Sequence, residues 1–140
     1  TAESLARDIE LAGELNVEML SVGPFLPHPE TPLAGAPKPS VDDVAKFLAV
    51  ARFALQPDVK VLVTTGFETL SPEARRIGLM SGANSVMLNV TPVEKRALYN
   101  IYPGRAHEDD TIDAQIQETI KMLEGLGRAP TDLSVGAPSS

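Results

Sequence analysis

The residues best suited to binding chemistry are a pair of threonines that directly follow an apolar run. Thr64 and Thr65 come after the apolar residues 61–63, and their hydroxyls and backbone N–H groups could hold a carboxylate or another anion. The alternative is that one threonine is β-branched strand filler and the other caps a turn. A third candidate, Asn89, follows a later apolar run.

Two histidines and the lack of cysteine limit the metal chemistry that the sequence can carry. His28 lies between two prolines, where it could bind a ligand or pack within a loop. His107 precedes the acidic residues 108–110, which indicates a solvated acidic turn. We therefore expect no metal ligands, no structural zinc site and no thiolate-bound cluster on this chain. No Ser-His-Asp pattern, P-loop or GxGxxG motif occurs, so the residues by themselves assign no catalytic residue.

Composition and charge are those of an ordinary globular chain. Its 140 residues suit one domain, and 43% are hydrophobic. The net charge of −7 disfavours nucleic acid as a partner, because a surface that binds nucleic acid needs clustered Lys and Arg. No apolar run approaches the roughly 20 residues of a membrane span, and no secretory signal is recognisable. We expect a cytoplasmic protein that does not contact membranes.

Alternating apolar and amphipathic segments predict an α/β fold with a parallel sheet. Strands are expected at 19–22, at 60–64 and within 84–89. None of them alternates in hydropathy, which is typical of parallel strands buried on both faces. Helices are expected over residues 2–16, 40–56, 71–82, 91–100 and 110–126. Three parallel strands leave unpaired edges, so we expect further strands from the rest of a parent chain or from a second copy.

Several local signals refine these helices. Ser40 and Asp43 form a capping-box pattern, and Ser71 precedes a proline suited to a first helical position. Thr91 is expected to cap its helix, with Glu94 completing the box. The last helix is expected to bury an apolar stripe made of Ile112, Ile116, Ile120 and Leu123.

Two segments outside these elements have unusual compositions. Residues 23–39 contain six of the chain's 12 prolines, which predicts a stiff, extended loop. Such a long loop is functional or is a disordered linker, and its apolar Phe25, Leu26 and Leu33 favour the first alternative. The tail, residues 129–140, is expected to be flexible.

Ligands of parallel α/β folds bind at the carboxyl ends of the strands. In this sequence those ends are residues 23–25, 64–66 and 87–89. The unaided sequence thus gives a fold class and three candidate strand ends, and it assigns no reaction.

Five motifs, in consistent order along the chain, resemble one family. They are VGPFLPHPETPL at 22–33, VTTGFET at 63–69, GANSVMLNVTP at 82–92, RALYNIYPGR at 96–105 and LGR at 126–128. They resemble segments in the C-terminal part of the HydE family of radical S-adenosylmethionine (SAM) enzymes. These enzymes act in the maturation of FeFe hydrogenases and belong to the biotin synthase-like superfamily.

The resemblance implies a TIM-type (βα)8 radical SAM barrel with all helices outside. Residues 1–128 would supply roughly its last three strands. The full-length enzyme would use SAM and a 4Fe–4S cluster held by a CxxxCxxC motif, which this sequence lacks. The isolated chain is therefore expected to be inactive and to bind neither cofactor tightly. Its partners would be the N-terminal half of the barrel, or a second copy, and a small-molecule substrate.

The resemblance also implies two groups of binding residues. The positions that match SAM contacts in the family are Met87, Tyr99 and Ile101. The positions that match the lining of the internal anion or substrate site are Thr64, Thr65 and Met19.

Some positions depart from the family pattern and leave other functions open. Residues 66–68 place an acidic side chain, Glu68, near the expected substrate end, and the extra cysteines that some members carry near the C-terminus are missing. Biotin synthase-like and methylornithine synthase-like enzymes remain alternatives. Another alternative is a non-catalytic binding or assembly module, or an interaction domain that associates through its sheet edges.

Overall fold

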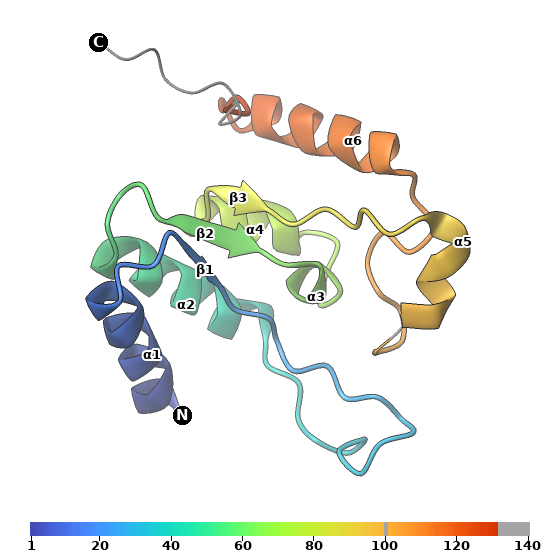
Figure 1. Cartoon of the computed structure of the whole chain (residues 1–140), viewed down its shortest axis with the longest axis horizontal. Helices are drawn as coiled ribbons and strands as arrows, with labels where there is room; N and C mark the ends of the chain where they lie inside the picture. The colour runs from blue at the N-terminus through green and yellow to red at the C-terminus, as the bar shows by residue number, and fades with distance from the viewer. Residues whose placement is uncertain (100, 132–140) are drawn as a thin grey trace.

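A computed structural model describes residues 1–99 and 101–131 of the chain (Figure 1). Along the chain its elements are α1 (Ala2–Glu14), β1 (Met19–Ser21), α2 (Val41–Ala54), β2 (Lys60–Val63), α3 (Thr65–Glu68), α4 (Ala74–Met80), β3 (Ser85–Val86), α5 (Val93–Arg96), a 3-10 turn (Ala97–Tyr99) and α6 (Ile112–Gly125). This order confirms the predicted α/β class.

The strands form one parallel sheet in the order β1-β2-β3. Leu20 lies beside Val61, and Val63 lies beside Val86. The backbone N–H of Met87 then donates to the Val63 carbonyl at 2.9 Å, which continues the ladder past β3. An open, three-stranded parallel sheet is consistent with part of a barrel.

The core lies on one face of this sheet, beneath α2 and α4. Val61 and Val63 are fully buried and belong to the same apolar cluster as Leu48 and Leu79 of these helices. The approach of α4 is close at Gly78, where an added Cβ would lie 2.8 Å from Val63 Cγ2. Helix α1 adds Ile9 and Ala12 to the same cluster.

The opposite face of the sheet is less covered, so the predicted burial on both faces holds for the central strand β2 and is wrong for β1 and β3. All three strands were expected to be buried on both faces, yet Met19 in β1 is 52% exposed and Met87, just after β3, is 38% exposed. Side chains alternate between the two faces of a strand, and Leu20 and Val86 pack toward the core. Met19 and Met87 therefore lie on the face away from α2 and α4.

The local signals at the helix starts were right at Ser40 and wrong at Thr91. The Ser40 hydroxyl accepts a hydrogen bond from the Asp43 N–H at 3.1 Å, and the Asp43 carboxylate accepts one from the Ser40 N–H at 3.0 Å. Helix α5 has Pro92 at its N-cap position and no side-chain cap. The Thr91 carbonyl instead accepts a hydrogen bond from Arg96 Nε at 2.8 Å, so a local contact with the end of α5 is present in place of the expected capping box.

Residues 65–68, which follow the end of β2, form the short helix α3. Ser71 behaves as a turn residue rather than a helix cap: its hydroxyl accepts from the Glu73 N–H at 3.2 Å, and α4 begins at Ala74.

Helix α6 buries only part of the predicted apolar stripe: Leu123 packs against the core. Ile112 is 37% exposed, whereas the polar Gln115 and Thr119 are buried. The side chain of Gln115 pairs with the backbone of Asn89, accepting from its N–H at 2.9 Å and donating to its carbonyl at 3.2 Å. Polar pairing therefore docks the first half of α6, and Met122, Leu123 and Leu126 pack against the core beyond it.

The remaining segments connect or follow these elements. Residues 22–40 form the long connection between β1 and α2 (Figure 1). Within residues 1–99 and 101–131, no helix is long and apolar enough to cross a membrane. Most of the tail that was expected to be flexible, residues 132–140, lies outside the described residues.

Candidate functional site at the carboxyl end of the sheet

The predicted substrate-site residues lie at or beside the carboxyl end of β2, in two different environments. Thr64 directly follows β2 and is 7% exposed. Its hydroxyl accepts a hydrogen bond from the Phe67 N–H at 3.2 Å and so caps α3. The same hydroxyl lies 3.5 Å from the Val22 carbonyl. The capping role that the sequence left open for one threonine therefore belongs to Thr64.

Thr65 is the first residue of α3 and is 4% exposed. Its carbonyl accepts a hydrogen bond from the Thr69 hydroxyl at 2.8 Å. Thr69 in turn accepts from the Ala106 N–H at 3.0 Å, which links the end of β2 to the chain that follows the 3-10 turn. Thr65 is thus held through its backbone carbonyl, whereas Thr64 uses its side chain.

Segments that follow different elements meet at this edge of the sheet. A Cβ added at Gly66 would lie 3.6 Å from the Pro24 ring and 3.6 Å from the Tyr102 hydroxyl. Pro24 follows β1, Gly66 follows β2, and Tyr102 follows the 3-10 turn. The carboxyl ends of neighbouring strands are therefore adjacent, as expected for parallel β-strands.

The residues expected to contact SAM are exposed but do not all lie together. Met87 follows β3 on the face away from the helices, and it shares that face with Met19. Tyr99 and Ile101 are 62% and 75% exposed and belong to the separate segment around the 3-10 turn and α5 (Figure 1). The structure thus puts the two methionines on one face and the other two residues on a neighbouring segment.

Glu68 does not face the expected substrate end. Its carboxylate pairs with the Arg75 guanidinium at 2.6 Å and 3.1 Å, and both side chains are more than nine-tenths buried. Such a bidentate pair satisfies a charge that would be costly to bury alone. Helix α3 thus directs Glu68 toward Arg75 of α4, where its charge is paired.

Arg96 is another buried cation that the sequence analysis missed. It is 2% exposed and donates hydrogen bonds to five backbone carbonyls, those of Asn89, Thr91, His107, Glu108 and Asp110. These contacts join the end of β3 to the loop before α6. Arg96 thereby positions the acidic turn. The sequence around Arg96 in α5 contains no pattern that predicts its burial.

The acidic turn at His107 is not the solvated segment that the sequence suggested. The His107 side chain is 16% exposed and has a backbone φ of 60°. Arg75 Nη2 lies 2.7 Å from its Nε2, and the Asp110 carboxylate lies 2.7 Å from its Nδ1. Glu68 Oε2 lies 3.0 Å from the same Nε2, so His107 joins the buried Glu68–Arg75 pair to the acidic residues before α6. His107 lies 32 positions after Arg75, so no local pattern could have revealed its place in the cluster.

No protein-family model matches the chain. The chain is 41% identical over 132 residues to the [FeFe] hydrogenase maturase subunit HydE of Thermotoga maritima. The match covers 93% of this chain and 37% of that protein, so the chain spans well under half the length of its curated relative. The resemblance in the five motifs thus extends to nearly the whole chain, which is HydE-like and corresponds to a C-terminal part of such a protein.

Proposed function

We propose that this chain forms the ligand-facing C-terminal wall of a HydE-like radical SAM enzyme that acts in FeFe-hydrogenase maturation. The observation that carries this proposal is the 41% identity to HydE over 93% of the chain. The fold supports it, since the helices α2 and α4 cover one face of a parallel sheet and leave Met19 and Met87 exposed on the other. In a closed barrel that second face would line the interior.

The two implied cofactors fit this chain to different extents. The sequence has no cysteine, so the chain does not supply the thiolates that hold a 4Fe–4S cluster. We assign that cluster to the remainder of the parent protein. SAM, when bound beside such a cluster, supplies the radical chemistry of the class.

The exposed side chains near the sheet suit SAM better than they suit the cluster. Met87, Tyr99 and Ile101 present apolar or aromatic surface to solvent, and aromatic rings pack well against a planar base. We assign these three residues to SAM binding in the assembled enzyme. Their role would be to orient the cofactor and to exclude water from it.

The substrate wall would comprise Thr64, Thr65 and Met19. Thr64 acts through the cap of α3, so it positions the backbone at the end of β2. Thr65 is the better candidate for a direct anion contact, because its hydroxyl is not the one that caps the helix. Met19 would add apolar surface from β1. The substrate is proposed to be a small molecule of the hydrogenase maturation reaction.

The rest of the barrel is the proposed partner, with a second copy of the chain as the alternative. A HydE-like enzyme of this kind would act in the cytoplasm. A non-catalytic binding module is the second candidate function, and it is favoured by one observation: the chain carries the exposed wall without any cysteine.

The decisive experiment uses the parent protein that contains this chain. After anaerobic reconstitution, we expect the absorption and spin-resonance signals of a 4Fe–4S cluster, and 5′-deoxyadenosine formation from SAM. A parent protein without a cluster-binding cysteine motif, or one that never cleaves SAM, would contradict the proposed enzyme function. The non-catalytic binding module would then be the remaining proposal. The 140-residue chain alone is expected to show neither signal.

The SAM assignment is tested separately by replacing Tyr99 with alanine in the parent protein. We expect SAM binding to weaken about tenfold, which corresponds to ~1.4 kcal/mol. Phe53→Ala is the matched control, because Phe53 is 93% exposed on α2, on the helical side of the sheet. Equal SAM affinity in both variants would remove Tyr99 from the site without affecting the family assignment.

A further inference from the structure

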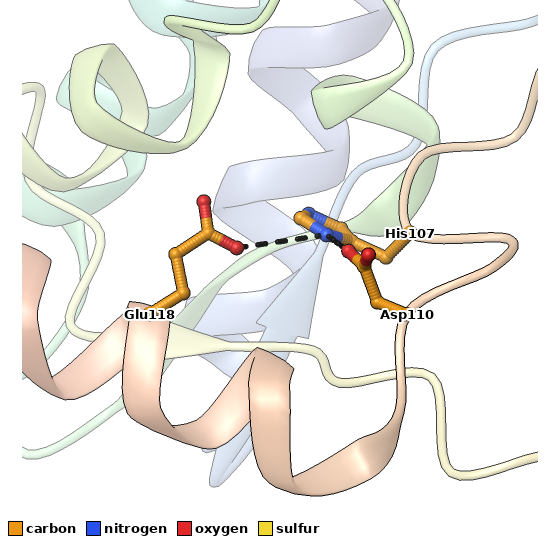
Figure 2. Close-up of side chains that lie close together, drawn as sticks. All are labelled: His107, Asp110 and Glu118. Atoms are coloured by element: carbon orange, nitrogen blue, oxygen red, sulfur yellow. Dashed lines mark hydrogen bonds and ion pairs between the residues drawn. The ribbon is translucent and has the colours of Figure 1, made fainter.

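We propose that His107, Asp110 and Glu118 form a binding site for a divalent transition cation such as Zn²⁺. Figure 2 shows the three side chains turned toward one another, His107 and Asp110 from the loop before α6 and Glu118 from α6 itself. The site includes none of the residues that we assign to SAM or substrate binding. It differs from the expectation, drawn from the sequence, that the chain has no metal ligands.

The distances between the donor atoms are close to those that a tetrahedral ion requires. Nδ1 of His107 lies 2.7 Å from the Asp110 carboxylate and 3.8 Å from the Glu118 carboxylate, and all three donors lie within 4.8 Å of one another. Two ligands of a tetrahedral zinc, with bonds near 2.0 Å, are about 3.3 Å apart. Small side-chain adjustments would therefore give a three-ligand site with an open position.

The surroundings of His107 supply the support that a metal-bound imidazole needs. A ligating histidine usually donates its other ring N–H to a carboxylate. Glu68 Oε2 lies 3.0 Å from His107 Nε2, and Glu68 is fixed by its bidentate pair with Arg75. Metal binding at Nδ1 requires the ring proton on Nε2, where the Glu68 carboxylate can accept its hydrogen bond. Arg75 Nη2, now 2.7 Å from Nε2, also donates to Glu68 Oε2 at 3.1 Å and would keep only that bond.

The charges also favour a cation. Arg75 is committed to Glu68, and its nearest approach to Glu118 is 3.9 Å. Asp110 and Glu118 therefore bring two further carboxylates to a half-buried imidazole. Neutral imidazole with two carboxylates is a donor set that suits zinc and other divalent first-row metals.

The position of the site gives the ion a structural consequence. His107 and Asp110 belong to the loop that Arg96 holds against the end of β3, and Glu118 lies on α6. An ion that bridges them would tie α6 to this loop. Since a ligand that binds only the folded state stabilises it, we expect the ion to raise the melting temperature.

The test uses the 140-residue chain, in which no cysteine can contribute a metal signal. Titration with ZnCl₂ by calorimetry should give saturable one-site binding, and CoCl₂ should give the visible absorption bands of a low-coordinate N,O site. Glu118→Gln should weaken binding at least tenfold. Glu124→Gln, a matched change at an exposed glutamate of the same helix, should leave it unchanged.

The variants distinguish metal binding by His107 and Glu118 from a purely structural role of these side chains. Glu118 is 53% exposed, so its conservative replacement should preserve the fold, as checked by circular dichroism. Absence of saturable binding, or equal affinity in Glu118→Gln and Glu124→Gln, would overturn the site. A His107→Gln variant that stays folded but still gives the cobalt spectrum would also overturn it.

Discussion

At the scale of single residues, Thr64 and Thr65 show how neighbours of one type acquire different roles. The chain turns from strand to helix between them, so only Thr64 stands at the N-cap of α3. Its hydroxyl satisfies a backbone N–H that the helix leaves unpaired. Thr65 is then left as the threonine with a proposed binding role.

The two roles predict opposite results for the same substitution. Thr64→Val should lower the free energy of unfolding by about 1 kcal/mol, the usual cost of losing a cap. Thr65→Val in the parent protein should weaken substrate or anion binding more than it lowers the melting temperature. Urea denaturation and ligand titration of both variants measure the two effects. A destabilised Thr65→Val protein with unchanged affinity would make Thr65 a structural residue.

A second residue-scale prediction concerns acid stability at the start of α2. The Ser40 hydroxyl, and then the Ser40 backbone N–H, hold the pKa of the Asp43 carboxyl below its ordinary value. A group with a depressed folded-state pKa stabilises the fold above its unfolded pKa, about 3.9 for aspartate. That contribution is lost as the pH falls through the lower folded-state pKa.

Replacing Asp43 with asparagine should therefore reduce the acid dependence of stability below about pH 4. Thermal melts over a pH series measure it, and Asp42→Asn is the control because Asp42 lies in the same helical turn outside the capping box. An identical pH profile in wild type and Asp43→Asn would show that the capping box contributes nothing to acid stability.

At the scale of elements, the contact between α4 and β2 depends on the absence of a side chain. A Cβ at Gly78 would lie 2.8 Å from Val63 Cγ2 and 3.0 Å from Phe67 Cε1. Both neighbours are fully buried, so neither can move freely. The close packing of α4 on β2 therefore depends on glycine at position 78.

Gly78→Ala should therefore destabilise the protein by about 1–3 kcal/mol through overpacking, even though alanine is the better helix former. Gly125→Ala is the matched control, since Gly125 ends α6 and a Cβ there meets nothing within 4 Å. That change should be neutral or slightly stabilising. Chemical denaturation measures both, and equal effects at the two glycines would contradict the packing argument.

At the scale of the whole molecule, the sheet is open where a barrel would be closed. The order β1-β2-β3 leaves an outer edge on β1 and another on β3. The face that carries Met19 and Met87 is also partly exposed. Unpaired edges and exposed apolar surface promote association, and in a parent barrel the remaining strands would cover both.

We therefore expect the 140-residue chain to self-associate and the parent protein not to do so through this surface. Sedimentation velocity over a range of concentrations measures the association. Hydrogen exchange on the same samples reports whether the strand amides are protected. A concentration-independent monomer with protected amides in all three strands would contradict the view that partner strands are missing.

The sequence alone determined the features that depend on local order along the chain. Continuous apolar runs predicted the parallel strands, and the Ser40–Asp43 pattern predicted a capping box that the structure contains. The five motifs predicted the HydE-like character that the 41% identity confirms. These signals are local because strand hydropathy, capping and motif spacing each involve residues close together in the chain.

Only the tertiary structure decided where the charged and polar side chains lie. Glu68 pairs with Arg75, Gln115 bonds to Asn89, and His107 lies among groups from three separate segments. Asn89 and Gln115 are 26 positions apart, and Arg75 and His107 are 32 apart, so no local pattern predicts these contacts. They form because a buried polar group must find a partner wherever the fold brings one. The open face, the buried pairs and the cation site are therefore properties of the fold rather than of the sequence pattern.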